Sequence, residues 1–178
     1  MTIPSRLAAL TLLLTASLPA QAKVLDVARD GFTLENSVTV PVDAMTAWKA
    51  LVNDVGQWWP AAHTWSGKAA NLSIQAQAGG CFCEIDGGLQ VQHMSVSFVQ
   101  PGKLLRMLGG LGPLQGMGMS GTMEWRLAAA KDGGTTITLW YRAGGYTPDD
   151  ISGFVPVIDK VQGQQLGGLG RFLSKPAQ

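Results

Sequence analysis

Apolar and polar residues alternate along several short stretches of this chain, and this period of two is typical of half-buried β-strands. It occurs at residues 71–78, at 119–127 and again at 135–141. A β-branched stretch at residues 32–42 has the composition of a strand as well. The pattern therefore predicts a protein built largely from short strands.

Glycine-containing turns separate these strands. Residues 87–88 are both glycine and lie between two strand-like segments, 81–86 and 89–101. A two-residue glycine turn between such segments predicts a β-hairpin. The turn at residues 132–134, Asp-Gly-Gly, predicts a second hairpin from the two alternating segments that it joins. A Pro-Gly pair at 101–102 precedes one more short strand.

Two other segments have the period of an α-helix. Asp43 precedes residues 44–54, and its side chain can cap the first backbone N–H groups of a helix there. From Val157 to Leu173, apolar residues recur at intervals of three and four, although several glycines lower the intrinsic helix propensity. The sequence predicts a short helix after the first strand and a long helix at the end.

The order of these elements predicts an α+β protein. A curved antiparallel sheet of about six or seven strands needs a cover for its apolar inner face, and the terminal helix is the only predicted element long enough to provide one. We therefore expect the sheet to wrap around that helix, with one or two short helices after the first strand. A space remains between a bent sheet and a helix of this kind.

The N-terminal residues have the order of regions found in a secretory signal peptide. Arg6 precedes an apolar run from Leu7 to about Leu18, and the small residues Ala20 and Ala22 follow. We predict cleavage after Ala22, hence a periplasmic or secreted protein. The run is too short to span a membrane, which takes about 20 residues. Residues 23–178 are then predicted to form one domain.

The charge balance excludes some partners. With Arg6 removed, the 13 Lys and Arg residues fall to 12, equal to the 12 Asp and Glu residues. The sequence therefore predicts no nucleic-acid binding, which requires a basic surface. Charged residues make up 14% of the chain, compared with about 25% in an average protein. This low fraction suits a protein that handles apolar molecules.

Several segments, taken in order, resemble one known family. They are residues 40–67, AGGCFCE at 78–84, the Pro-Gly pair before KLLRML, GGLGPLQG at 109–116, GTTITLWYRAGGY at 134–146 and the Gln- and Leu-rich terminal helix. Together they resemble the START/Bet v 1-like (SRPBCC) helix-grip superfamily, and within it the polyketide-cyclase and Hsp90-activator-C-terminal-like branch. The resemblance covers residues 32–173. It implies a sheet wrapped around the terminal helix, with an interior cavity for hydrophobic or aromatic small molecules.

An aromatic cluster lies where this fold has one mouth of its cavity. Three of the six tryptophans and one of the two histidines fall within residues 58–65. Trp58 and Trp59 are candidates to close the apolar end of the cavity, and His63 is a candidate polar contact at its entrance. Neighbouring residues of a helix point about 100° apart, so we expect only one of these two tryptophans to be fully buried.

Glu84 and His93 are candidate catalytic residues. They lie on the two strands joined by the 87–88 turn, where they can face each other across the hairpin. A carboxylate that orients a buried imidazole forms a general base, although the same pair can be purely structural. Arg106, on the next strand, is a candidate to neutralise Glu84 or to hold the carboxylate of a ligand.

The remaining candidate ligand contacts are apolar or aromatic residues of the later strands: Met117, Met119, Trp125, Tyr141 and Tyr146. The first two belong to residues 116–121, which match the dinucleotide pattern G-x-G-x-x-G. That pattern requires a following helix and an acidic residue about 20 positions later, and neither is predicted here. We interpret the segment as a bulged strand, and we expect no cofactor.

Cys81 and Cys83 are separated by one residue. Alternate residues of a regular strand lie too far apart for a disulfide, so we expect two buried thiols. Together with His93 they lack zinc-finger spacing, so no metal site is predicted.

Three functions remain open. The first is a carrier or sensor of a hydrophobic or aromatic small molecule. The second is an enzyme of the cyclase or hydro-lyase type that uses Glu84 and His93 as acid and base. The third is a protein-binding module that presents the aromatic cluster as an exposed patch, with an unknown partner.

Overall fold

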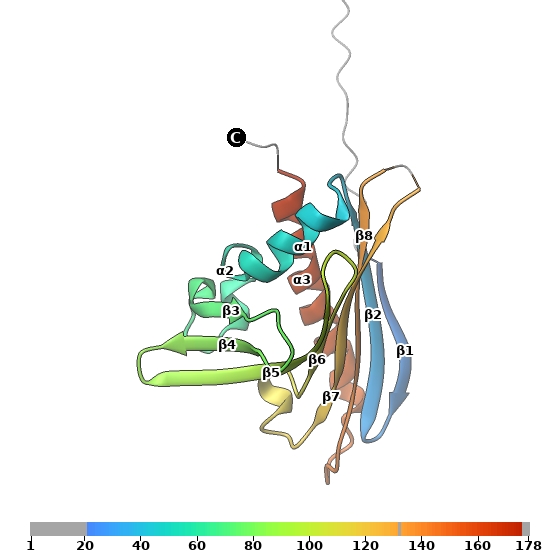
Figure 1. Cartoon of the computed structure of the whole chain (residues 1–178). Coiled ribbons are helices and arrows are strands. Elements are labelled where there is room, and N and C mark those ends of the chain that lie inside the picture. The colour runs from blue at the N-terminus through green and yellow to red at the C-terminus, as the bar shows by residue number, and fades with distance from the viewer. Residues whose placement is uncertain (1–20, 132, 176–178) are drawn as a thin grey trace, which may run out of the picture.

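The computed structural model describes residues 21–131 and 133–175, and its central feature is one antiparallel sheet that curves around a long C-terminal helix (Figure 1). The sheet has eight strands in the order β1-β2-β8-β7-β6-β5-β4-β3. The α+β prediction is confirmed, with eight strands rather than six or seven. All neighbouring strands run antiparallel.

The strands follow the sequence pattern closely. Their bounds are β1 Gln21–Ala28, β2 Gly31–Val40, β3 Leu72–Ile74, β4 Cys81–Asp86, β5 Leu89–Gln100, β6 Leu104–Leu108, β7 Ser120–Ala129 and β8 Thr135–Gly144. Both predicted hairpins form, β4–β5 around residues 87–88 and β7–β8 around residues 130–134. The alternating segment at 71–78 is a strand only over its first part, because the chain turns away after Ile74.

The strand that the sequence did not predict is β1, at one edge of the sheet (Figure 1). Its pairing with β2 shifts between Val24 and Asp26, which leaves Leu25 without a partner. This irregularity interrupts the alternation on which strand prediction depends. The predicted signal peptide, residues 1–22, lies almost wholly outside the described residues, so cleavage after Ala22 stays a prediction.

Within residues 21–131 and 133–175, three α-helices accompany the sheet: α1 Ala44–Asn53, α2 Val55–Trp58 and α3 Val155–Leu173. The predicted cap of α1 is present, since Asp43 Oδ1 accepts hydrogen bonds from the backbone N–H groups of Met45 (2.9 Å) and Thr46 (3.0 Å). Among the described residues, no helix is long and apolar enough to cross a membrane.

The core lies between the concave face of the sheet and α3. Its largest fully buried side chains include Trp125 and Tyr141, together with the methionines Met94, Met107 and Met123. Helix α3 packs against β1 and β2 and is also in contact with α1 and α2. Large side chains therefore fill the middle of the space between sheet and helix.

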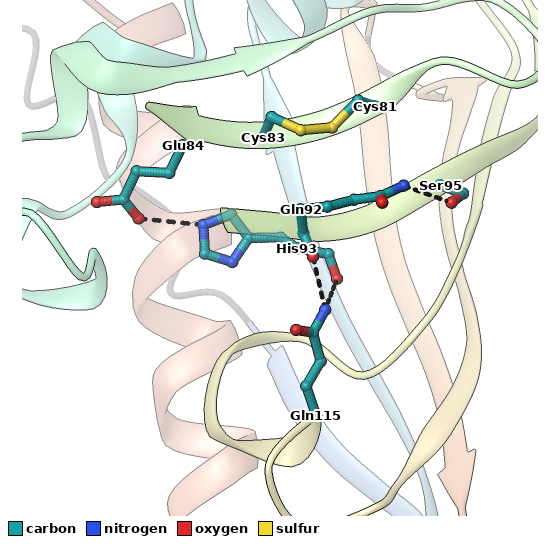
Figure 2. Close-up of a disulfide and its surroundings, with 7 residues drawn as sticks. All are labelled: Cys81, Cys83, Glu84, Gln92, His93, Ser95 and Gln115. Carbon is teal, nitrogen blue, oxygen red and sulfur yellow. Dashed lines mark hydrogen bonds and ion pairs between the residues drawn. A yellow bond between two sulfur atoms is a disulfide. The ribbon is translucent and has the colours of Figure 1, made fainter. Parts of the chain in front are cut away.

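Cys81 and Cys83 form a disulfide on β4, so the expectation of two buried thiols is wrong (Figure 2). Their Cα atoms are 5.4 Å apart, within the range that a disulfide spans. Two residues of a regular strand advance about 6.6 Å, so β4 is contracted here. The contraction lies opposite a β-bulge in β5, where the pairing moves from Phe82–Met94 to Cys83–Gln92 and skips His93.

We expect this disulfide to contribute little to stability. It closes a loop of only three residues, for which the chain-entropy model gives about 1–2 kcal/mol. Replacing both Cys81 and Cys83 by serine should lower the free energy of unfolding by about that amount, measured by urea denaturation. Dithiothreitol should shift the wild type to the same midpoint and leave the double variant unchanged. A loss of several kcal/mol would show that the bridge holds more than its own strand.

Candidate functional site

A cavity of about 310 Å³ lies beside the first half of α3, away from the filled middle of the core. Its wall comes from four parts of the chain: the aromatic segment 59–65, strand β5 at His93, the loop 111–114 and helix α3. The lining residues on α3 and just before it are Phe154, Val157, Ile158, Val161, Gln162 and Gln165. The volume is at the lower end of the range for small-molecule sites, roughly 300–1,000 Å³.

The aromatic segment closes one side of the cavity. Helix α2 ends at Trp58, and Trp59 already has an extended backbone before Pro60 (φ −69°, ψ 135°). The two tryptophans are therefore not successive residues of one helix, and both are buried, at 4% and 5% exposure. The expectation that only one of them is fully buried is wrong. Their rings are tilted against each other with centroids 5.4 Å apart.

Only the second of these tryptophans lines the cavity. The Trp58 indole donates to the carbonyl of Ala50 on α1 (3.0 Å) and belongs to the core. The Trp59 indole donates to the carbonyl of His63 (3.1 Å), which holds the segment in a closed turn over the cavity. His63 lines the cavity too, and its Nδ1 atom is buried. Burial lowers the pKa of the His63 imidazole.

Glu84 anchors the same segment to the sheet. Its carboxylate is completely buried and accepts hydrogen bonds from the backbone N–H groups of Trp65 (3.0 Å) and Ser66 (2.5 Å). Burial by itself raises the pKa of the Glu84 carboxyl, but the hydrogen bonds from Ser66, Trp65 and His93 together bring this pKa below its ordinary value. Glu84 is therefore ionised at neutral pH and acts as an acceptor in every contact.

His93 faces Glu84 across the hairpin, as the sequence predicted. Its Nε2 atom lies 3.1 Å from Glu84 Oε2, and both side chains are buried (Figure 2). His93 is also the residue skipped by the pairing of β4 with β5, so it occupies the β-bulge and both it and Met94 are buried. Burial lowers the pKa of the His93 imidazole, although Glu84 acts in the opposite direction. His93 lines the cavity and is neutral at pH 7.

Two hydrogen-bonded contacts position the loop on the other side of the cavity. The Gln115 amide donates to the carbonyls of Gln92 (2.6 Å) and His93 (2.9 Å), so it ties the loop to the bulge (Figure 2). The buried Tyr141 hydroxyl donates to the carbonyl of Gly109 (3.1 Å) and accepts from the N–H of Leu111 (3.2 Å). Burial raises the pKa of Tyr141 to about 12, so the hydroxyl stays protonated.

Of the residues that the sequence proposed as ligand contacts, Trp59 and His63 line the cavity, and the candidate base His93 does as well. Trp58, Met119, Trp125 and Tyr141 are packed into the core instead, while Tyr146 is 89% exposed. Met117 is partly buried against the core. No residue of β7 or β8 lines the cavity, so Trp125 and Tyr141 belong to the packed core and not to its wall.

Arg106 lies on the outer face of the sheet. Its Nε atom donates to Glu124 Oε1 (2.6 Å), and Arg126 Nε donates to Glu124 Oε2 (2.7 Å). The prediction that Arg106 could neutralise Glu84 is therefore wrong. Alternate residues of β6 point to opposite faces of the sheet, and Leu105 and Met107 occupy the inner face. The guanidinium also lies over the Phe98 ring, 5.3 Å from its centroid.

The G-x-G-x-x-G segment is a turn and not a bulged strand. A short 3-10 helix, Gly112–Leu114, is followed by turns through Gly118, and β7 begins at Ser120. As expected, no helix follows the segment, so the arrangement that holds a pyrophosphate is absent from this part of the described chain.

Sequence reasoning missed the two glutamines of the cavity wall. Gln162 and Gln165 are 1% and 2% exposed and lie on the buried stripe of α3, among residues such as Ile158 and Leu166. A polar residue at a helical position reserved for apolar side chains is a signal available in the sequence. Trp65, which is 57% exposed, also lines the cavity.

Comparison with known proteins gives the fold. No protein-family model matches this chain, and no curated protein is significantly similar to it in sequence. Solved structures do match: DynU16, from the dynemicin biosynthetic locus, has 20% identity and a TM-score of 0.55, over 79% of this chain and 46% of DynU16. CalU16 from Micromonospora echinospora has 14% identity and a TM-score of 0.53, over 87% of this chain and 85% of that one.

The third similar structure is Ara h 8.0201, with 18% identity and a TM-score of 0.54 over 80% of this chain and 97% of the other. At such identities the likeness concerns the fold alone. The fold in question is the one described above, a curved antiparallel sheet closed by a long C-terminal helix.

Proposed function

We propose that this chain, which has a Bet v 1-like helix-grip fold, binds a hydrophobic or aromatic small molecule in the cavity beside α3, as a carrier or a sensor. One observation carries the proposal: a cavity of about 310 Å³ is walled mainly by apolar and aromatic side chains and is held open by hydrogen-bonded loops. Sites that bind small molecules combine such walls with a few polar groups.

Burial of the ligand's apolar surface supplies most of the affinity in this proposal. Each Å² of apolar surface removed from water contributes about 25 cal/mol. The aromatic residues of the wall are Trp59 and Trp65 from the aromatic segment and Phe154 just before α3. Because Trp59 is fixed by its hydrogen bond to His63, this wall is organised before the ligand arrives.

We also propose that the protein works in the periplasm or outside the cell. The predicted signal peptide is the basis of this proposal. The Cys81–Cys83 disulfide supports it, since disulfides persist in oxidising compartments and are rare in the cytosol.

Filling the cavity tests the proposed function. Val161 lines the cavity from α3, and an indole at this position should occupy space that a ligand needs. We expect Val161→Trp to weaken the binding of naphthalene, measured by equilibrium dialysis, by at least about tenfold, or 1.4 kcal/mol. The matched control is Ile85→Trp on β4, because Ile85 is exposed and does not line the cavity. Equal binding by both variants and the wild type would refute an interior site.

The second candidate function is catalysis of the cyclase or hydro-lyase type in the same cavity. The observation in its favour is that His93 lines the cavity and is hydrogen-bonded to the buried Glu84, with a neutral imidazole that can accept a proton. Mass spectrometry of the protein purified from its own host separates the two functions. A bound molecule released unchanged supports a carrier, whereas a chemically altered product that disappears in His93→Ala supports an enzyme.

A further inference from the structure

The apolar cavity carries buried polar atoms that have no hydrogen-bond partner among the described residues. These atoms are His63 Nδ1, His93 Nδ1, Gln162 Nε2 and Oε1, and Gln165 Oε1. All four residues line the cavity, and His93, Gln162 and Gln165 are 3% exposed or less. Buried polar groups are nearly always paired, so their concentration at one cavity points to a ligand that pairs with them.

The contact with Glu84 fixes what His93 can offer. An ionised carboxylate only accepts hydrogen bonds, so the proton in the 3.1 Å contact belongs to His93 Nε2. In a neutral imidazole the other nitrogen is then an acceptor. His93 therefore carries an unpaired lone pair on Nδ1 in the wall of the cavity, and only a donor can pair with it.

Among the described residues, the cavity wall offers no charged side chain that could pair with an ionised ligand. None of the described residues that line it is Asp, Glu, Lys or Arg. The buried Glu84 carboxylate lies 3.1 Å from His93 Nε2, and it repels an anion placed at the imidazole. The Glu84 carboxylate already accepts hydrogen bonds from Trp65, Ser66 and His93 and is not among the lining residues, so it does not offer itself to a cation in the cavity.

Resting on the proposed function, we infer that the ligand is an uncharged molecule with an apolar or aromatic body and a hydroxyl or N–H group that donates a hydrogen bond to His93 Nδ1. Gln162 complements this group, because its amide offers both N–H donors and a carbonyl acceptor. A phenol is the simplest molecule of this class, since its hydroxyl both donates and accepts.

Three probes with the same bicyclic body test the inference: naphthalene, 2-naphthol and 2-naphthoate. Equilibrium dialysis of the full chain at pH 7 gives the dissociation constant of each. We expect 2-naphthol to bind at least about tenfold more tightly than either of the others, a difference of 1.4 kcal/mol. Naphthalene lacks the donor, and 2-naphthoate carries a charge that the wall cannot pair.

Two variants assign the preference to residues. His93→Phe should remove the advantage of 2-naphthol over naphthalene, so that the two dissociation constants differ by less than about threefold in this variant. Gln162→Leu should reduce the same advantage without touching the Glu84–His93 contact, so it keeps the test valid if His93→Phe does not fold. The matched control is Gln92→Leu, since Gln92 precedes His93 on β5, is exposed and does not line the cavity.

The outcomes are distinct. Equal binding of naphthalene and 2-naphthol, or tighter binding of 2-naphthoate, overturns the inference and leaves the proposed function standing. A preference for 2-naphthol that survives in both His93→Phe and Gln162→Leu also overturns it. Binding of none of the three probes overturns the proposed function and the inference with it.

Discussion

Replacement of Glu84 by alanine should lower the free energy of unfolding by about 3–5 kcal/mol, as the loss of one partner in a buried charged network does. The carboxylate accepts from the backbone of Trp65 and Ser66 and from the imidazole of His93. Alanine leaves all three donors without their acceptor. Urea denaturation measures the stability, and amide hydrogen exchange of Trp65 and Ser66 measures whether the aromatic segment is released.

The same strand offers a matched control. Asp86 lies two residues after Glu84 on β4, and its carboxylate pairs with Lys68 at 3.3 Å on the surface. Exposed pairs of this kind contribute about 0–1 kcal/mol, so Asp86→Asn should be nearly neutral. If Glu84→Ala and Asp86→Asn had similar small effects, the aromatic segment would be held by packing alone, and Glu84 would not be its anchor.

The second large effect is expected at the contact between α3 and α2. A Cβ atom added to Gly168 would lie well inside the contact distance of the carbonyl oxygen of Trp58. This obstacle is backbone, which cannot rotate away as a side chain does. We expect Gly168→Ala to lower the free energy of unfolding by about 1–3 kcal/mol, measured by thermal or urea denaturation, despite the better helix propensity of alanine.

The neighbouring glycine should respond in the opposite direction. A Cβ atom on Gly167 would meet only the end of the Arg171 side chain, at 3.2 Å. Arginine can move aside, so Gly167→Ala should gain most of the difference in helix propensity, about 0.5–1 kcal/mol. Destabilisation of both variants by the same amount would mean that the helix, rather than its contact with α2, is sensitive at this point.

The role of Glu84 connects stability to the cavity. By holding Trp65 and Ser66, it fixes the end of the segment that begins at Trp59, and by accepting from His93 it decides which imidazole nitrogen carries the proton and which is left unpaired. A variant of Glu84 is therefore expected to change the stability of the fold and the preference among ligands together.

The sequence predicted the elements well where local interactions decide them. The hairpin around residues 87–88, the cap at Asp43 and the terminal helix all follow from turn chemistry, side-chain capping and helical periodicity. The facing of Glu84 and His93 was predictable for the same reason, since a two-residue turn fixes the register of its strands.

Other features of the site were outside the reach of the sequence. The disulfide requires the contraction of β4 opposite the bulge, and the bulge places both His93 and Met94 inside, whereas strict alternation allows only one of them. The wall of the cavity comes from segments more than 90 residues apart, between Trp59 and Gln165. No local pattern indicates which of the apolar residues on these segments pack into the core and which remain at a cavity.

The sequence by itself determined that this chain is a curved sheet with a C-terminal helix, because turns, caps and hydrophobic periods act between residues close together in the chain. Only the tertiary structure decided where the space remains and which polar atoms of its wall are left unpaired. Large side chains such as Trp125 and Tyr141 fill the middle of the sheet, so the cavity lies beside the first half of α3. Packing depends on the volumes of residues that meet from distant segments, and it is complete only when all of them are in place.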